Sequence, residues 1–365
     1  MTMGNVSREQ IEKALRDYRD PYLQQDLMTA GAIEDISIAG ETVAIQVALG
    51  YPASGVEAEL RAALTEKVLA LPGIDKLSLT VRQEVISHAV QQGVKPLPNI
   101  KNIIAVASGK GGVGKSTTAV NLALALAQEG ARAGILDADI YGPSQPRMLG
   151  SQARPETHDG RSMEPVICHG LQSMSIGYLI DEETPMIWRG PMVTTALEQL
   201  LRETNWQAMD YLVIDLPPGT GDTQLTLAQK IPVSGAVIVT TPQDIALLDA
   251  RKALKMFEKV SVPVLGVIEN MSTHVCSHCG HEEAIFGSGG GQQMAAQYDI
   301  ELLGALPLQR RIREDADSGR PSVITDPEGE IARRYREIAR RVAGRLAVQA
   351  RDYSARFPEI VIEND

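Results

Sequence analysis

The spacing of hydrophobic and polar residues divides the chain into two regions. In residues 8–82 the apolar positions repeat at short periods. Residues 11–18 and 56–71 have the apolar spacing of helices. Apolar and polar residues alternate, as in strands, in the runs IEDISIAG and TVAIQVALG on either side of Gly40-Glu41, and again in KLSLTV. Periods near 3.6 and 2 residues are those of helices and of half-covered strands. This region is therefore predicted to be a small α+β unit with a β-hairpin at Gly40.

From residue 101 onward the apolar residues form continuous runs that are separated by helical patterns. Continuous runs are typical of strands that are covered on both faces, as in a parallel sheet with helices on each side. The pattern predicts a doubly wound α/β domain with a mostly parallel sheet. The runs are NIIAVAS, AGILDAD, YLVIDLP, AVIVTTP, VPVLGVIEN and LLGALPL.

The segment between these regions, EVISHAVQQGVKPLPN, has no clear period and contains two prolines, as is common in linkers. We therefore expect four parts in the chain. These are a small α+β domain in residues 5–83, a linker in 84–100, an α/β domain in 101–351 and an acidic tail in 352–365.

The last helical pattern is strongly basic. Residues 330–351 combine a helical stripe of apolar positions with seven arginines. A basic amphipathic helix can lie on a membrane surface. However, this stripe contains no Trp or Phe, and the acidic segment FPEIVIEND follows it. We expect the helix to pack on the sheet with its arginines in solvent.

Composition narrows the possible functions. The chain has 365 residues, 44% of them hydrophobic, so it can bury a large core, and its formal net charge is −11. We expect no nucleic-acid binding, because phosphate contacts need a basic surface. No apolar run approaches the ~20 residues of a membrane helix, and the amino terminus has no signal-peptide pattern. We therefore expect a cytoplasmic protein that does not bind membranes.

The three cysteines are too few for a disulfide framework in a chain of this length. Cys168 follows a strand-like run and is expected to be a buried free thiol. Cys276 and Cys279 form a CxxC pair, which can bring two thiolates to a zinc ion or an iron–sulfur cluster, or act as a redox dithiol. One pair supplies half of a four-thiolate site. Nearby histidines offer a Cys₂His₂ zinc site within one chain as an alternative; they are His274, His278 and His281.

The most specific motif, GKGGVGKS at residues 109–116, fits the phosphate loop G-x-x-x-x-G-K-[ST] between a strand and a helix. Its glycines allow backbone N–H groups to surround phosphate oxygens, Lys115 brings a positive charge to the β and γ phosphates, and Ser116 can bind Mg²⁺. The motif predicts an ATP site. Its residues are Gly109, Lys110, Gly111, Gly112, Val113, Gly114, Lys115, Ser116 and Thr117.

Aspartates lie at the ends of two predicted strands. Asp137 and Asp139 follow the second strand of the α/β region, and Asp215 ends a later strand in YLVIDLPPGTGD. When such strands follow a phosphate loop in the sequence, the carboxylates at their ends can reach Mg²⁺ and the attacking water. We therefore expect Asp215 to be a Walker-B-like Mg²⁺ ligand. The glycine-proline turn that follows it suits a segment that switches with phosphate state.

The phosphate loop resembles the deviant form found in the MinD and nitrogenase iron-protein class of ATPases, where the first lysine reaches across a dimer. This resemblance implies an ATP-sandwich homodimer in which Lys110 acts on the nucleotide of the other subunit. Two chains related by a two-fold axis would each offer one CxxC pair. Four thiolates would then complete a bridging [4Fe–4S] or tetrahedral zinc site.

Over residues 101–325 the chain resembles the Mrp/ApbC iron–sulfur cluster carriers, and residues 8–82 resemble the iron–sulfur-assembly domain that often precedes them. The segments that carry the resemblance are DADIYGPSQP, MIWRGPM, DYLVIDLPPGTGD, VIENMS, CSHCGHEEAIFGSGGG and LLGALPLQRRIREDADSGRP. The resemblance implies that Cys276 and Cys279 bind a labile [4Fe–4S] cluster, which comes from an assembly scaffold and passes to apo-proteins with ATP binding and hydrolysis.

The same resemblance implies roles for further residues. Lys110, Lys115 and Asp139 are the expected catalytic residues, with Asp139 positioning water. Asp137 is expected in the metal shell or as a switch residue, Asn270 at the adenine and Pro307 beside the base. The small domain of many relatives has a cysteine after its second strand, but GYPASG has none. We therefore do not expect the small domain to handle a cluster by itself.

Two other functions share parts of this pattern. A MinD- or ParA-like positioning ATPase would use the same deviant loop, with a structural zinc at the CxxC pair. An electron-transfer reductase like nitrogenase iron protein would bridge its cluster with single cysteines from two separate loops, which this sequence does not show.

Overall fold

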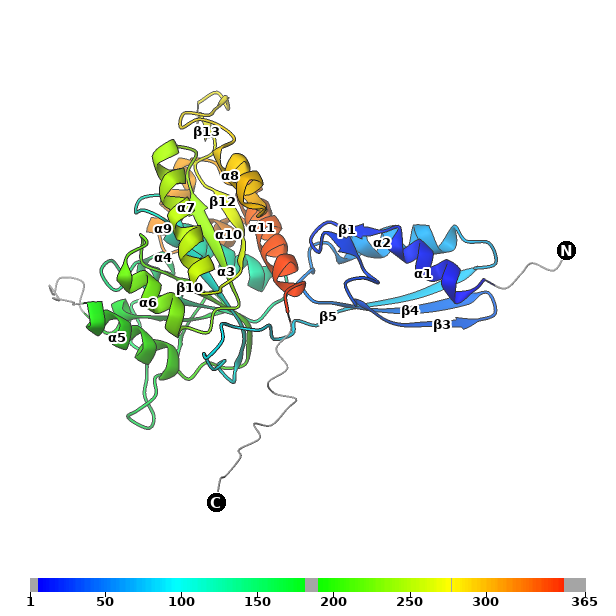
Figure 1. Ribbon diagram of the computed structural model, residues 1–365, viewed down its shortest axis with the longest axis horizontal. Helices are drawn as coiled ribbons and strands as arrows, with labels where there is room; N and C mark the ends of the chain where they lie inside the picture. The colour runs from blue at the N-terminus through cyan, green and yellow to red at the C-terminus, as the bar shows by residue number, and fades with distance from the viewer. Residues whose placement is uncertain (1–5, 181–189, 277, 351–365) are drawn as a thin grey trace, which may run out of the picture.

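The computed structural model describes residues 6–180, 190–276 and 278–350, which form two units (Figure 1). The N-terminal unit contains a three-stranded sheet in the order β3-β4-β5, with β3 antiparallel and β5 parallel to β4. The predicted hairpin is confirmed, because Ala39 pairs with Thr42 across the turn at Gly40. The strands are β3 (Ile33–Ala39), β4 (Thr42–Leu49) and β5 (Lys76–Gln83).

Two helices cover one side of this sheet (Figure 1). Alternate side chains of β4 are buried, as the period of two predicts. The first helix begins at a capping box in which Ser7 and Gln10 bond each other's backbone N–H groups. The remaining elements of the unit are α1 (Arg8–Arg16), β1 (Arg19–Asp20), β2 (Gln25–Asp26) and α2 (Glu57–Leu69).

The second unit is built on an eight-stranded sheet in the order β15-β12-β11-β6-β10-β7-β9-β8. All neighbouring strands are parallel except β8 and β9. The six continuous apolar runs form β6 (Ile100–Ala107), β7 (Ala133–Asp137), β10 (Met209–Asp215), β11 (Gly235–Thr240), β12 (Val264–Glu269) and β15 (Leu302–Ala305). β8 (Val166–Cys168) coincides with the strand-like run at Cys168, whereas the pattern does not predict β9 (Leu171–Ser175), which is short and includes polar residues.

Helices lie on both faces of this sheet, so the predicted doubly wound fold is confirmed. One face carries α3 (Lys115–Gln128) and α11 (Glu330–Ala347), which pack against each other. The other face carries α5 (Gly190–Arg202), α6 (Asp222–Lys230), α7 (Asp244–Lys259) and α8 (Gly290–Tyr298). Short elements complete the unit: α4 (Gln145–Met148), the 3-10 helix η1 (Ile176–Tyr178), β13 (His274–Val275), β14 (Glu282–Glu283), α9 (Arg310–Asp317) and α10 (Ser322–Thr325).

The segment predicted as a linker packs closely on the α/β unit. His88 and Gln91 are buried, and the backbone N–H of His88 donates to Asn102 Oδ1 at 3.1 Å. Gln91 Nε2 donates to the carbonyl oxygens of Ala228 and Ile231 at 2.6 and 2.9 Å. These bonds fix the path of the chain between the two units.

The N-terminal unit also contacts the C-terminal end of α3, next to the middle of α11, through one buried carboxylate. Glu129, the C-cap of α3, is fully buried, and its Oε1 accepts hydrogen bonds from Arg336 Nε at 2.6 Å and Arg340 Nη1 at 2.7 Å. Its Oε2 accepts from the backbone N–H of Gly55 at 2.9 Å. The ring of Tyr22 lies 5.2 Å from the Arg340 guanidinium. We call Glu129, Arg336, Arg340 and Gly55 the interdomain clamp.

The clamp corrects one expectation about α11. Its helical form and its packing against the sheet are confirmed, but two of its arginines do not lie in solvent. The side chains of Arg336 and Arg340 are only 19% and 11% exposed, because both neutralise Glu129. Within the described ranges, no helix is both long and apolar enough to cross a membrane. The predicted acidic tail in 352–365 and the MIWR part of MIWRGPM lie outside the described residues.

Candidate functional site

The phosphate loop lies between β6 and α3. Gly112 and Gly114 have φ angles of 82° and 81°, in the left-handed region that favours glycine. A Cβ atom at Gly114 would also collide with the side-chain amide of Asn270. No side chain caps the first turn of α3. The N–H groups of that turn are therefore available to an anion such as phosphate.

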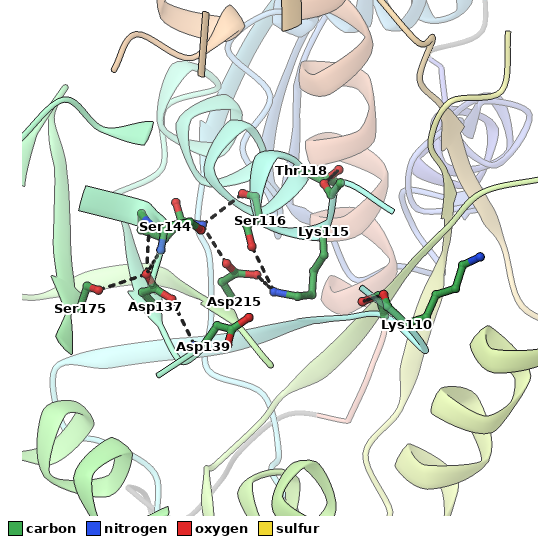
Figure 2. A network of polar contacts seen from close by, with 12 residues as sticks. Lys110, Lys115, Ser116, Thr118, Asp137, Asp139, Ser144, Ser175 and Asp215 are labelled. Carbon is green, nitrogen blue, oxygen red and sulfur yellow. Dashed lines mark hydrogen bonds and ion pairs between the residues drawn. The ribbon is translucent and has the colours of Figure 1, made fainter. Parts of the chain in front are cut away.

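Other parts of the motif surround this turn. Ser116 and Thr117 lie in the first turn of α3, with Val113 buried just before it. A Cβ atom at Gly109 would collide with the backbone of Asp249, so the loop packs closely on α7. Gly111 has open space around it. Figure 2 shows that the side chain of Lys110 points away from the other labelled side chains.

Lys115 forms a buried ion pair with Asp215. Its Nζ contacts Asp215 Oδ1 and lies 3.2 Å from the hydroxyl of Ser116. Asp215 ends β10 and is completely buried. A buried charge needs a partner, and this pair provides one for each residue. A phosphate that draws Lys115 to itself would release Asp215 Oδ1 for another cation.

Asp137 holds the loop that follows β7. Its Oδ2 accepts from the backbone N–H of Ser144 and Gln145 at 2.9 and 3.0 Å and from the Ser175 hydroxyl at 3.1 Å. Its Oδ1 accepts from the N–H of Asp139 at 3.1 Å (Figure 2). Burial, and then the charge of Asp215, raise the pKa of Asp137, while these hydrogen bonds and Lys115 oppose the increase. The aspartate therefore joins the strand end to the loop.

Asp139 lies beside this cluster with a less buried carboxylate. Burial raises the pKa of Asp139, and the positive charge of Lys115 acts in the opposite direction. In Figure 2 the carboxylates of Asp137, Asp139 and Asp215 gather on the same side of α3 as Ser116 and Lys115. The structure thus brings together the predicted residues that would serve phosphate, metal and water.

Asn270 and Pro307 come from two neighbouring strand ends. Asn270 follows β12, and its Nδ2 donates to the carbonyl oxygen of Val113 in the phosphate loop at 2.8 Å. Pro307 follows β15 and is buried. The two strand ends are joined by hydrogen bonds between Leu306 and its neighbours Glu269 and Ser272, at 2.9 Å each. Asn270 therefore touches the phosphate loop directly, and Pro307 lies at the neighbouring strand end.

The CxxC pair lies in a small hairpin that begins four residues after Asn270, at His274. β13 and β14 pair antiparallel, and the hairpin projects at one end of the α/β unit (Figure 1). The backbone N–H groups of Cys279 and His278 stabilise the thiolate of Cys276 and lower its pKa. Cys276 is partly exposed and Cys279 is exposed. Both sulfurs are therefore accessible at the surface.

The histidines near the pair do not complete a metal site in the structure. Within residues 6–180, 190–276 and 278–350, no three His, Cys, Asp or Glu side chains are grouped so that they could hold a metal ion. Cys168 is buried in β8, with its sulfur 4.0 Å from the hydroxyl of Tyr178. The location of Cys168 agrees with the expected buried free thiol.

Three polar residues of the network were absent from the prediction: Ser144, Gln145 and Ser175. All three bond Asp137, and Gln145 also bonds Ser116 and Asp215. Ser144 and Gln145 lie inside the segment DADIYGPSQP, and their place directly after Asp137 and Asp139 is the signal that could have identified them. Ser144 and Gln145 lie at the start of α4 and Ser175 lies at the end of β9, and both elements have only a weak pattern of apolar residues in the sequence.

We expect Gly114→Ala to destabilise the phosphate loop. The substitution forces a left-handed φ on alanine and pushes against Asn270, which costs about 1–3 kcal/mol. Thermal unfolding without nucleotide measures this cost. Gly111→Ala is the matched control, because that position has open space and an ordinary φ. Equal melting temperatures for the two variants would contradict the prediction.

Comparisons with known proteins agree with this geometry. Residues 99–343 match the family described as NUBPL iron-transfer P-loop NTPase, and residues 8–81 match the iron–sulfur cluster assembly protein family. The iron–sulfur cluster carrier protein of Haemophilus influenzae is 49% identical over 340 residues, covering 93% of this chain and 92% of the relative. The protein of the same name from Pseudomonas fragi is 58% identical over 271 residues, covering 74% of this chain and 94% of the relative.

Among solved structures, the nucleotide-binding protein of Archaeoglobus fulgidus in complex with ADP aligns with a TM-score of 0.55 and 37% identity, over 64% of this chain and 90% of that chain. The matches favour the predicted carrier family over the positioning ATPases. The chain therefore belongs to the family of NUBPL-type iron-transfer P-loop NTPases, and an iron–sulfur cluster assembly unit precedes its NTPase unit.

Proposed function

We propose that the protein is an ATP-dependent carrier of iron–sulfur clusters. The observation that carries this proposal is the short connection between the two sites: Asn270 bonds the phosphate loop, and the hairpin with Cys276 and Cys279 begins four residues later, at His274. A [4Fe–4S] cluster, the cargo, would be held by two cysteines from each of two subunits. It would come from an assembly scaffold and pass to apo-proteins.

The site has the oxygen donors that Mg²⁺ prefers. We assign the Ser116 hydroxyl and the carboxylates of Asp215 and Asp139 to the metal and its waters. Mg²⁺ would neutralise the charge of the bound phosphates. Asp137 has both oxygens occupied by hydrogen bonds to its own loop, so we assign it the switch role. We propose that Asn270 and Pro307 contact the adenine.

We propose that the same residues hydrolyse ATP. Asp139 would position the attacking water, and Lys115 would leave Asp215 to bind the β and γ phosphates. Lys110 points out of its own site and would reach the nucleotide of a second subunit (Figure 2). Slow hydrolysis would serve as a switch between closed and open dimers.

A second subunit also fits the surface beside the phosphate loop. Ile245 and Leu248, on the part of α7 that contacts Gly109, are 65% and 49% exposed. Exposed apolar side chains of this kind stabilise a complex when a partner's surface covers them. We therefore propose a homodimer in which these two residues and Lys110 face the partner. The cytoplasm is our proposed compartment, because thiolate ligands and a labile cluster need reducing conditions.

The test of this function is to purify the protein without oxygen, reconstitute it with iron and sulfide, and measure the bound cluster and its transfer. We expect about two iron and two sulfide per chain, in a dimer, with absorbance that moves to an apo-enzyme. Stable zinc at one ion per monomer, resistant to exchange for iron, would instead support a structural metal. Absence of cluster transfer in the presence of ATP would also count against the carrier function.

A further inference from the structure

Gln145 connects three parts of the nucleotide site. It is the first residue of α4 and its side chain is 1% exposed. Its side-chain Nε2 donates to the carbonyl oxygen of Ser116 at 3.1 Å and to Asp215 Oδ2 at 2.9 Å. Its backbone N–H donates to Asp137 Oδ2 at 3.0 Å. One residue thus joins the first turn of α3, the end of β10 and the loop after β7.

The orientation of the Gln145 amide follows from its partners. Both groups near Nε2 are acceptors, so the NH₂ group must face them and Oε1 must face elsewhere. Oε1 is buried and has no hydrogen-bond partner among the described residues. A buried carbonyl oxygen without a donor costs about 1–3 kcal/mol. A donor that the chain itself does not provide would remove this cost.

Hydrated Mg²⁺ offers such a donor. Magnesium usually retains several waters, and each of them can donate hydrogen bonds. Ser116 and Asp215, the two residues held by the NH₂ group, are also our proposed metal ligands. The unpartnered oxygen is the other arm of the same amide group and faces away from the two acceptors that the NH₂ group holds.

We propose that Gln145 is a positioning residue of the magnesium site: its NH₂ group orients Asp215 beside Ser116, and its Oε1 accepts a hydrogen bond from a metal-bound water. The proposal rests on the proposed ATP–Mg²⁺ function. It matters most when phosphate has drawn Lys115 away, because Asp215 then loses its only cationic partner among the described residues. Residues that orient metal ligands in this way typically change metal affinity about 10–100-fold when they are replaced.

The test measures metal binding directly. Mn²⁺, which reports on magnesium sites by electron paramagnetic resonance, is titrated into the ADP complex of wild type, Gln145→Met and Gln145→Leu. We expect the dissociation constant of Mn²⁺ to rise about 10–100-fold in both variants. The affinity for ADP in EDTA should change less than about twofold, because no phosphate contact is lost. Methionine and leucine have similar volumes to glutamine, and thermal unfolding shows which variant keeps the wild-type fold.

Gln128→Leu is the matched control. Gln128 lies at the other end of α3, donates one hydrogen bond to the carbonyl oxygen of Val323 at 2.8 Å, and also has a buried Oε1 without a partner. Its replacement should leave the Mn²⁺ affinity unchanged. Wild-type Mn²⁺ affinity in a folded Gln145 variant would overturn the proposal for Gln145 alone. Failure of wild-type protein to bind nucleotide and Mn²⁺ together would overturn the proposed function instead.

Discussion

Replacing Cys276 and Cys279 together with alanine is expected to reduce cluster binding to background. These thiols are the two accessible ones, and the hairpin backbone already favours the thiolate of Cys276. A four-iron cluster needs four ligands, and a dimer without these residues would retain none at the hairpins. Iron, sulfide and visible absorbance after anaerobic reconstitution measure the loss.

Cys168→Ala is the control for this experiment. Cys168 is buried in β8, and its sulfur lies 4.0 Å from the Ser173 and Tyr178 hydroxyls, so it is remote from the surface chemistry of the hairpin. That variant should bind as much cluster as the wild type. The carrier function would be refuted by a double variant that binds cluster as well as the wild type does.

Glu129→Ala is expected to destabilise the protein by about 3–5 kcal/mol. The substitution leaves Arg336 and Arg340 largely buried without their carboxylate, and removing one partner of a buried ionic group has a cost of this size. Gly55 also loses the acceptor of its backbone N–H. Urea denaturation monitored by circular dichroism measures the free energy of unfolding.

Glu330→Ala provides the comparison on the same helix. Glu330 pairs with Arg334 at 2.7 Å, but their side chains are 57% and 38% exposed, so the loss should not exceed about 1 kcal/mol. The triple variant Glu129→Leu, Arg336→Leu, Arg340→Met should recover part of the stability, since it leaves no buried charge unpaired. Similar losses for Glu129→Ala and Glu330→Ala would show that the interdomain clamp contributes little.

Patterns within short stretches of sequence predicted most of the α/β sheet and the phosphate loop. Continuous apolar runs mark β6 and β10 because both faces of these strands are covered, and the glycine pattern marks a loop that must surround phosphate. The order of motifs was enough to place Asp137, Asp139 and Asp215 at one end of the sheet.

Contacts between distant parts of the chain could not be predicted in the same way. Periodicity showed that residues 330–347 form a helix, but Glu129 is 207 and 211 positions away from Arg336 and Arg340, so no local pattern connects them. Gln145 lies inside the segment DADIYGPSQP, but no spacing rule gives it a role, and its contacts are visible only when β7, β10 and α3 meet. Both cases involve polar residues that are buried because a partner is brought to them by the fold.

The interdomain clamp has a consequence for the history of the family. A Cβ atom at position 55 would collide with Arg336, and the acid at 129 is tolerable only while both arginines surround it. Glu129, Arg336 and Arg340 all belong to the α/β unit, and of the groups that bond the carboxylate only the Gly55 backbone comes from the small unit. In chains without the small unit, the acid would keep both arginines and lose one hydrogen bond, so these three residues can persist where the glycine has no counterpart.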